Sequence, residues 1–179
     1  MDRPLVETPT HVADLVHRAA VRSPSGAAIV DIAQSHTYTW AGLSAAIGAE
    51  AARLRAAGVA PGDRVVVRLP GGVPFCVAML GAQHAGGVAV PLGPAGVDFE
   101  LDAVLGDCAP RTVIAVEDDE DASRGAAGRG AVLLPAPDPT AGQGSGEPTG
   151  GGEDIALLAY TGRPTQSPRG ALLSHRALL

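Results

Sequence analysis

Residues 155–175 read IALLAYTGRPTQSPRGALLSH, and this stretch indicates how the chain is organised. The apolar run Ile155–Ala159 predicts a strand, residues 160–170 predict a loop of small and hydroxyl side chains, and a second apolar run follows. A strand that feeds such a loop is one way in which proteins hold phosphate. Backbone N–H groups converge, small residues admit the ligand and a cation neutralises its charge. We expect a phosphate-binding loop here; an ordinary surface loop is the alternative.

The two ends of this loop carry a resemblance to a known family. Tyr160-Thr161 at the front and Pro168-Arg169-Gly170 at the back match, without gaps, a loop that usually runs Tyr-Thr-Ser-Gly-Thr-Thr-Gly-x-Pro-Lys-Gly. The stretch thus resembles the phosphate-binding loop of adenylate-forming (AMP-binding) enzymes, which include acyl-CoA synthetases, adenylation domains of nonribosomal peptide synthetases, and luciferases. The resemblance implies ATP and Mg²⁺ as ligands, with phosphate contacts from Thr161, Gly162, Thr165, Arg169 and Gly170.

The middle of the loop departs from the family pattern. Arg163 and Gln166 stand where the family has glycine, and Pro164 stands where it has the first threonine of a pair. Glycine reaches φ > 0 and admits close backbone approach at little steric cost, which Arg and Gln do not. Proline also removes a backbone N–H. Arg169 replaces the family lysine, which keeps the charge but changes its shape. We therefore predict a degenerate phosphate-binding loop.

The remainder of the chain predicts an α/β fold with a mostly parallel sheet flanked by helices. It resembles the first N-terminal subdomain of adenylate-forming enzymes, in the Tyr38–Leu43 element, the Gly62-Asp63 turn and the Pro91-Leu92-x-Pro94 motif. Apolar periodicity predicts helices from Val12 (capped by Thr10), over 40–57, over 73–85 and up to Cys108. Strands are expected at 27–32, 36–39, 65–69, 111–116, 131–134 and 155–160.

Composition shifts divide the chain into three parts. Residues 1–134 form the α/β subdomain, and residues 135–154, rich in Gly and Pro, form a linker or surface loop. Residues 155–179 return to the same domain with a strand, the phosphate-binding loop and the start of the next element.

Charge and composition exclude several classes of partner. The net charge is −6, which argues against nucleic acid, and no apolar run is long enough for a membrane span. All 13 basic residues are arginines, so chemistry that needs a lysine cannot run on these residues alone. Cys76 and Cys108 lack disulfide or zinc spacing, and we expect them to be small buried residues. The compartment expected is the cytoplasm.

Several other polar residues have simple structural interpretations. We expect His11 and His17 at the surface or an interface, and His84 packed or half-exposed at a helix end. The acidic run at 117–121 lacks the organisation of a calcium loop and is interpreted as a solvated loop. No metal site and no catalytic residue is assigned.

Three functions remain open. The first is an adenylation-like domain that cannot adenylate alone and has an accessory or repurposed role in acyl or peptide biosynthesis. The second is the N-terminal part of an ATP-dependent acid–thiol ligase completed by another chain. The third is a new small enzyme using Arg163, Arg169 and His175. The resemblance covers only the first part of a complete adenylating enzyme, so we expect a strand edge to be left uncovered. Such an edge predicts self-association or a protein partner. The partner could be a complementing ligase fragment, a synthetase or a carrier protein.

Overall fold

A computed structural model describes residues 9–94, 98–142, 144, 146–161 and 169–179. Its helices are α1 Val12–Arg22, α2 Trp40–Ala56, α3 Val73–His84, α4 Asp98–Cys108, α5 Glu120–Ala127 and α6 His175–Leu178. Its strands are β1 Ala27–Asp31, β2 His36–Thr39, β3 Arg64–Arg68, β4 Val88–Leu92, β5 Thr112–Ala115, β6 Val132–Pro135, β7 Ile155–Thr161 and β8 Arg169–Ser174.

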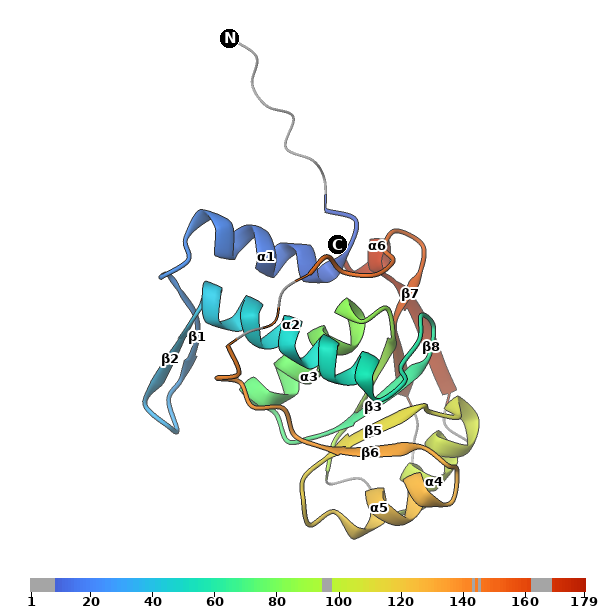
Figure 1. Ribbon diagram of the computed structural model, residues 1–179. Coiled ribbons are helices and arrows are strands. Elements are labelled where there is room, and N and C mark those ends of the chain that lie inside the picture. The colour runs from blue at the N-terminus through green and yellow to red at the C-terminus, as the bar shows by residue number, and fades with distance from the viewer. Residues whose placement is uncertain (1–8, 95–97, 143, 145, 162–168) are drawn as a thin grey trace.

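The strands form a six-stranded sheet and a separate hairpin (Figure 1). The order in the large sheet is β6-β5-β3-β4-β7-β8; its pairings are parallel except that β8 runs antiparallel to β7. Strands β1 and β2 pair antiparallel beside α1 and α2. The predicted α/β fold with a mostly parallel sheet is confirmed, and strands form where they were expected at 27–32 and 36–39.

Both faces of the central strands are covered by helices. Val65 and Val67 of β3 pack in a cluster with α2 and α3, while Val66 packs in a cluster with α4 and α5. All three valines are fully buried. This explains the uninterrupted apolar run of β3, because a strand covered on both faces has no solvated side.

The connections that follow β3 and β5 diverge at the carboxyl ends of these neighbouring strands. The chain leaves β3 through α3 on one face of the sheet and leaves β5 through α5 on the other. Neighbouring strands whose connections diverge in this way leave the space that open α/β sheets use for ligands. Strand β7 ends at the same edge, since it runs parallel to β4 with Ala89 opposite Leu157.

The interpretation of the acidic run as a solvated loop is confirmed for Glu117 and Asp118, which lie exposed in a turn, and is wrong for the three residues that follow. Residues 120–127 form α5, and Asp119 caps it by accepting a hydrogen bond from the Ala122 N–H at 2.9 Å. Glu120 and Asp121 lie in its first turn, where the helix dipole favours negative charge. The side chain of Asp119 is buried, so this residue does not belong to a solvated loop.

Local contacts define the ends of three helices. The prediction that Thr10 caps α1 is wrong, since the cap is His11, whose Nδ1 accepts from the Ala13 N–H. Ser174 caps α6, as its hydroxyl accepts from the Ala177 N–H at 3.2 Å. Gly58, at φ +86°, follows the end of α2.

The contact between α2 and α3 depends on Gly81. A Cβ there would lie 2.4 Å from Cγ and 2.7 Å from Cβ of Glu50, which is itself buried. We expect Gly81→Ala to lower the free energy of unfolding by about 1–3 kcal/mol, because overpacking forces the two helices apart. Gly106 lies exposed on α4, and the nearest atom to a Cβ there is 3.7 Å away. Gly106→Ala is the control and should stabilise by about 0.5–1 kcal/mol. Urea titration of both variants checks this, and equal effects would contradict it.

Candidate phosphate-binding edge

The candidate site begins where β7 and β8 meet the predicted loop. Tyr160 pairs with Gly170, and Thr161 pairs with Arg169, in the antiparallel ladder. Thr161 and Arg169 therefore face each other across the mouth of the hairpin. The other two predicted site residues, Gly162 and Thr165, lie outside the described residues, as does Arg163. Thr161 lies at the carboxyl end of β7, which runs parallel to β4.

Gly170 has a packing reason to be glycine. A Cβ at this position would lie 2.6 Å from Cδ1 of Leu158 and 3.3 Å from Cε1 of Tyr160. Because Gly170 has no Cβ, the Tyr160 ring can pack directly against β8. This requirement is independent of phosphate binding, so the match of Gly170 to the family loop has a structural cause as well as a functional interpretation.

Tyr160 anchors the end of β7 to α4. Its hydroxyl donates to the Asp107 carboxylate at 2.5 Å. Burial, together with this hydrogen bond to an acceptor, raises the pKa of Tyr160 well above its ordinary value. The phenol therefore stays protonated at neutral pH, and it fixes the strand end rather than exchanging protons. Arg169, by contrast, is exposed and offers a cation to the loop.

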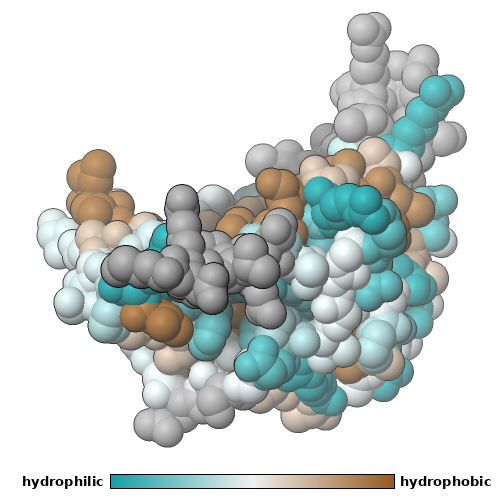
Figure 2. Space-filling view, turned by 90° about the horizontal axis from the view of Figure 1, so that it is seen from above, coloured by the Kyte–Doolittle hydropathy of each residue, from teal (hydrophilic) through white to brown (hydrophobic). Residues whose placement is uncertain are grey.

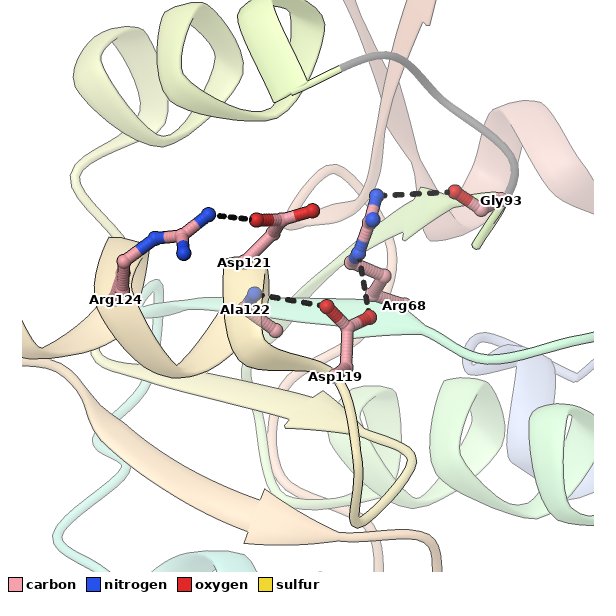
Figure 3. Close-up of polar contacts among 6 residues, drawn as sticks. All are labelled: Arg68, Gly93, Asp119, Asp121, Ala122 and Arg124. Carbon is pink, nitrogen blue, oxygen red and sulfur yellow. Dashed lines mark hydrogen bonds and ion pairs between the residues drawn. The ribbon is translucent and has the colours of Figure 1, made fainter.

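A buried ion pair joins the carboxyl end of β3 to the residue that precedes α5 (Figure 3). Nε of Arg68 donates to Oδ2 of Asp119 at 2.7 Å, and Nη1 lies 3.4 Å from the Gly93 carbonyl oxygen. The exposed fractions of the two side chains are 5% and 8%. The pair links the ends of β3 and β4 to the start of α5. The sequence patterns did not predict this pair, although Arg68 ends a buried strand and Asp119 caps the helix that follows another.

The described residues fit one phosphate contact and no metal site. Arg169 is exposed beside the loop, and a guanidinium suits a phosphate group. Among the described residues, no three His, Cys, Asp or Glu side chains gather as a metal site would need. When bound in such a loop, ATP with Mg²⁺ would supply the phosphoryl chemistry; this chain would supply Arg169 and the backbone that follows Thr161.

A histidine cluster lies at the opposite end of β8. The rings of His11 and His175 are 3.9 Å apart between centroids, and both side chains are buried. The expectation that His11 lies at the surface is therefore wrong; His17 is exposed and His84 is packed at the end of α3, as expected. Since β8 extends about 3.3 Å per residue, its ends hold Arg169 and His175 far apart. These two residues do not converge, which removes the basis of the third hypothesis.

The hydrogen bonds of the cluster require neutral rings. Nδ1 of His11 accepts from the Ala13 N–H, while its Nε2 lies 3.0 Å from the Gln83 carbonyl oxygen. Nδ1 of His175 accepts from the Val12 N–H at 3.2 Å. Burial lowers the pKa of both histidines, and for His11 the neighbouring His175 lowers it further. A proton on either Nδ1 would face a donor.

The cluster predicts a pH dependence of stability. Because the folded state lowers these pKa values below 6.5, it binds fewer protons than the unfolded chain. The stabilisation is complete above about pH 6.5 and is lost as the pH falls from there toward the lowered values. We expect the urea midpoint to fall between pH 7.5 and pH 5.5.

The control for this prediction is a double variant, His11→Gln with His175→Gln, whose midpoint should vary less over the same range. His17→Gln, which removes an exposed histidine, should retain the full dependence. A midpoint that is constant in the parent chain would contradict the prediction.

Comparisons with known proteins agree with this architecture. The family model described as AMP-binding enzyme matches residues 16–179. The chain is 37% identical over 163 residues to a feruloyl-CoA synthase of an Amycolatopsis species, covering 88% of this chain and 32% of that protein. It is 31% identical to nonribosomal peptide synthetase 7 of Aspergillus fumigatus, covering 92% of this chain and 7% of the synthetase.

Solved structures show the same fold. The N-terminal domain of FACL13 from Mycobacterium tuberculosis superposes with a TM-score of 0.81 at 25% identity, covering 93% of this chain and 45% of that one. MatB from Rhodopseudomonas palustris gives a TM-score of 0.78 at 31% identity, covering 91% of this chain and 34% of that one. The fold and the edge thus define an α/β protein of the adenylate-forming kind.

The chain belongs to the AMP-binding enzyme family, as the match over residues 16–179 shows. It spans only about a third of the length of the feruloyl-CoA synthase it matches, 32%, and corresponds to the N-terminal portion of the family's fold. None of the described helices is both long and apolar enough to cross a membrane.

Proposed function

We propose that these 179 residues form an adenylation-like domain portion that does not adenylate by itself and has an accessory or repurposed role in acyl or peptide biosynthesis. The observation that carries the proposal is the retained β7–β8 hairpin, with Arg169 opposite Thr161, around a loop in which Arg163, Pro164 and Gln166 depart from the family pattern. The fold is retained, whereas the loop departs from the pattern that binds phosphate. This combination fits a role without nucleotide chemistry. A cytoplasmic location fits this role and stays a prediction.

The loop departures support weak or absent ATP binding. Two side chains replace glycine where backbone would approach phosphate, and a proline removes one N–H donor. Phosphoryl and adenylyl transfer depends on positioned donors and cations around developing charge. With Arg169 as the exposed cation among the described residues of the hairpin, this edge offers one such group.

Direct measurement of ATP binding tests the proposal. We expect the purified chain to give no saturable heat with MgATP in isothermal titration calorimetry. The variant Arg163→Gly, Pro164→Thr, Gln166→Gly restores the family pattern and should gain binding, which a further Arg169→Ala change should remove. Saturable MgATP binding by the unaltered chain, lost with Arg169→Ala, would contradict the proposal that the loop is impaired.

A second proposal is that the chain is the N-terminal part of a carboxylate-activating ligase completed by another polypeptide. Strand β8 favours it: this strand is the last of the sheet, its residues 169–172 are exposed, and Leu172 is 63% exposed. An edge strand with unpaired backbone groups and apolar side chains favours pairing with another chain. Acid-dependent activity on mixing with such a partner, lowered by Arg169→Ala, would favour this proposal over the first. Recovery of the chain only with itself would count against it.

A further inference from the structure

A separate cavity lies between α1 and α2. Its volume is about 460 Å³, and it shares no residue with the phosphate-binding edge. Most of its lining is apolar, including Val16, Ala20 and Val21 of α1 and Ala41, Ala45 and Ile47 of α2. Small-molecule sites commonly have this size and combine apolar walls with a few polar groups.

The charged groups of this cavity are acidic. Asp14 of α1 and Glu147 of the segment that crosses α2 both line it. Within the part of the chain that the structure describes, neither carboxylate has an ion pair or a hydrogen bond through its side chain. His17 also lines it, on the exposed side of α1. An apolar space with two carboxylates at its border suits a cation.

His84 adds a buried polar group to the same cavity. The side chain is 9% exposed, and its Nδ1 has no hydrogen-bond partner among the described residues. An unpaired buried polar atom costs free energy, and a bound molecule or water that supplies a partner relieves that cost. The cavity thus combines an apolar wall, negative charge and an imidazole whose Nδ1 has no hydrogen-bond partner among the described residues.

A second cavity, of about 430 Å³, does not offer this combination. It lies at the amino ends of β3 and β4 and is lined by Arg64, Asp154 and His175. Arg64 donates to the carbonyls of Cys108 and Ala109, and Asp154 accepts from the Gly151 N–H. Its charged groups are already partnered, so it gives no preference for a charged ligand.

We propose that the cavity between α1 and α2 binds an organic cation, a molecule with a compact apolar body and a primary amine. The apolar body packs between the two helices, and the amine lies near Asp14 and Glu147. Figure 2 looks down on the side of the molecule where α1 lies, and hydrophobic patches are interspersed there with hydrophilic residues, so a small amphipathic ligand matches the chemistry of this side.

The test compares three probes of the same shape and different charge. They are 4-phenylbutylamine, 4-phenyl-1-butanol and 4-phenylbutyrate, titrated into the ¹⁵N-labelled chain at pH 8 and followed by amide chemical shifts. We expect the amine to bind about tenfold more tightly than the alcohol, since two partly exposed ion pairs together contribute a factor of this order. The butyrate should bind more weakly still. The shifted amides should lie in α1 and α2.

Variants separate the site from non-specific binding. Asp14→Asn and Glu147→Gln should each weaken the amine about threefold, whereas Glu117→Gln, an exposed carboxylate after β5, should leave it unchanged. Ala45→Phe should fill the cavity and abolish binding of all three probes. If this variant does not fold, Ala20→Phe fills the cavity from the facing helix and serves the same purpose. Equal binding of amine and butyrate, no binding of the amine, or undiminished binding in a folded filled variant would each overturn the proposal.

Discussion

Replacing Asp119 by alanine should lower the free energy of unfolding by about 3–5 kcal/mol, because it leaves the Arg68 guanidinium buried without a counter-charge. Arg68 is only 4% exposed, and its contact with the Gly93 carbonyl oxygen, at 3.4 Å, is too long to compensate. The variant also loses the cap of α5. Urea unfolding at pH 7.5, followed by circular dichroism, measures the effect.

The matched control is Asp121→Ala, two residues further along the same acidic run. Asp121 pairs with Arg124 on the surface of α5, where the Arg124 side chain is 68% exposed (Figure 3). Its loss should cost about 1 kcal/mol or less. Replacing both buried partners, Arg68→Met with Asp119→Leu, should recover much of the stability, since no unpaired charge remains. Equal losses for Asp119→Ala and Asp121→Ala would show that the buried pair stabilises the fold no more than the surface pair does.

The second large effect is expected at Leu105 of α4. This side chain is fully buried in the cluster that joins α4 and α5 to the sheet, and it lies against Gly125, where a Cβ would come within 2.5 Å of its Cδ1. Leu105→Ala should cost about 2–5 kcal/mol through lost burial and the cavity left behind. Leu133→Ala on β6, where 41% of the residue is exposed, is the control and should cost about 1 kcal/mol or less. A small effect at Leu105 would mean that α4 and α5 repack around the gap.

Most of the fold follows from local sequence patterns. The valine run of β3, the Thr39 cap of α2 and the Ser174 cap of α6 each have a signal that acts over a few residues. The missed helix α5 had such a signal too, in the acidic residues that begin it, but a run of like charges also fits a solvated loop. Local patterns could not decide between these two interpretations.

The positions of His11 and Arg68 were not predicted from the sequence, because they depend on contacts between distant parts of the chain. His11 and His175 are 164 positions apart in the numbering, yet their ring centroids lie 3.9 Å apart; nothing near either residue predicts the other. Arg68 looks like the end of a strand, and its burial follows only from the position of Asp119 beyond a crossover. The loop itself was found through its two ends, Tyr160-Thr161 and Arg169-Gly170, which the β7–β8 ladder brings together.

The most direct test of the central claim is acid-dependent exchange of labelled pyrophosphate into ATP by the purified chain, measured over a panel of aryl, fatty and amino acids. The chain spans about a third of the acyl-CoA synthetase relatives it matches, and its loop departs from the family pattern at three positions. We predict no exchange above background. Acid-dependent exchange by the chain alone, abolished by Arg169→Ala, would contradict the account and show that these residues hold a working adenylation site.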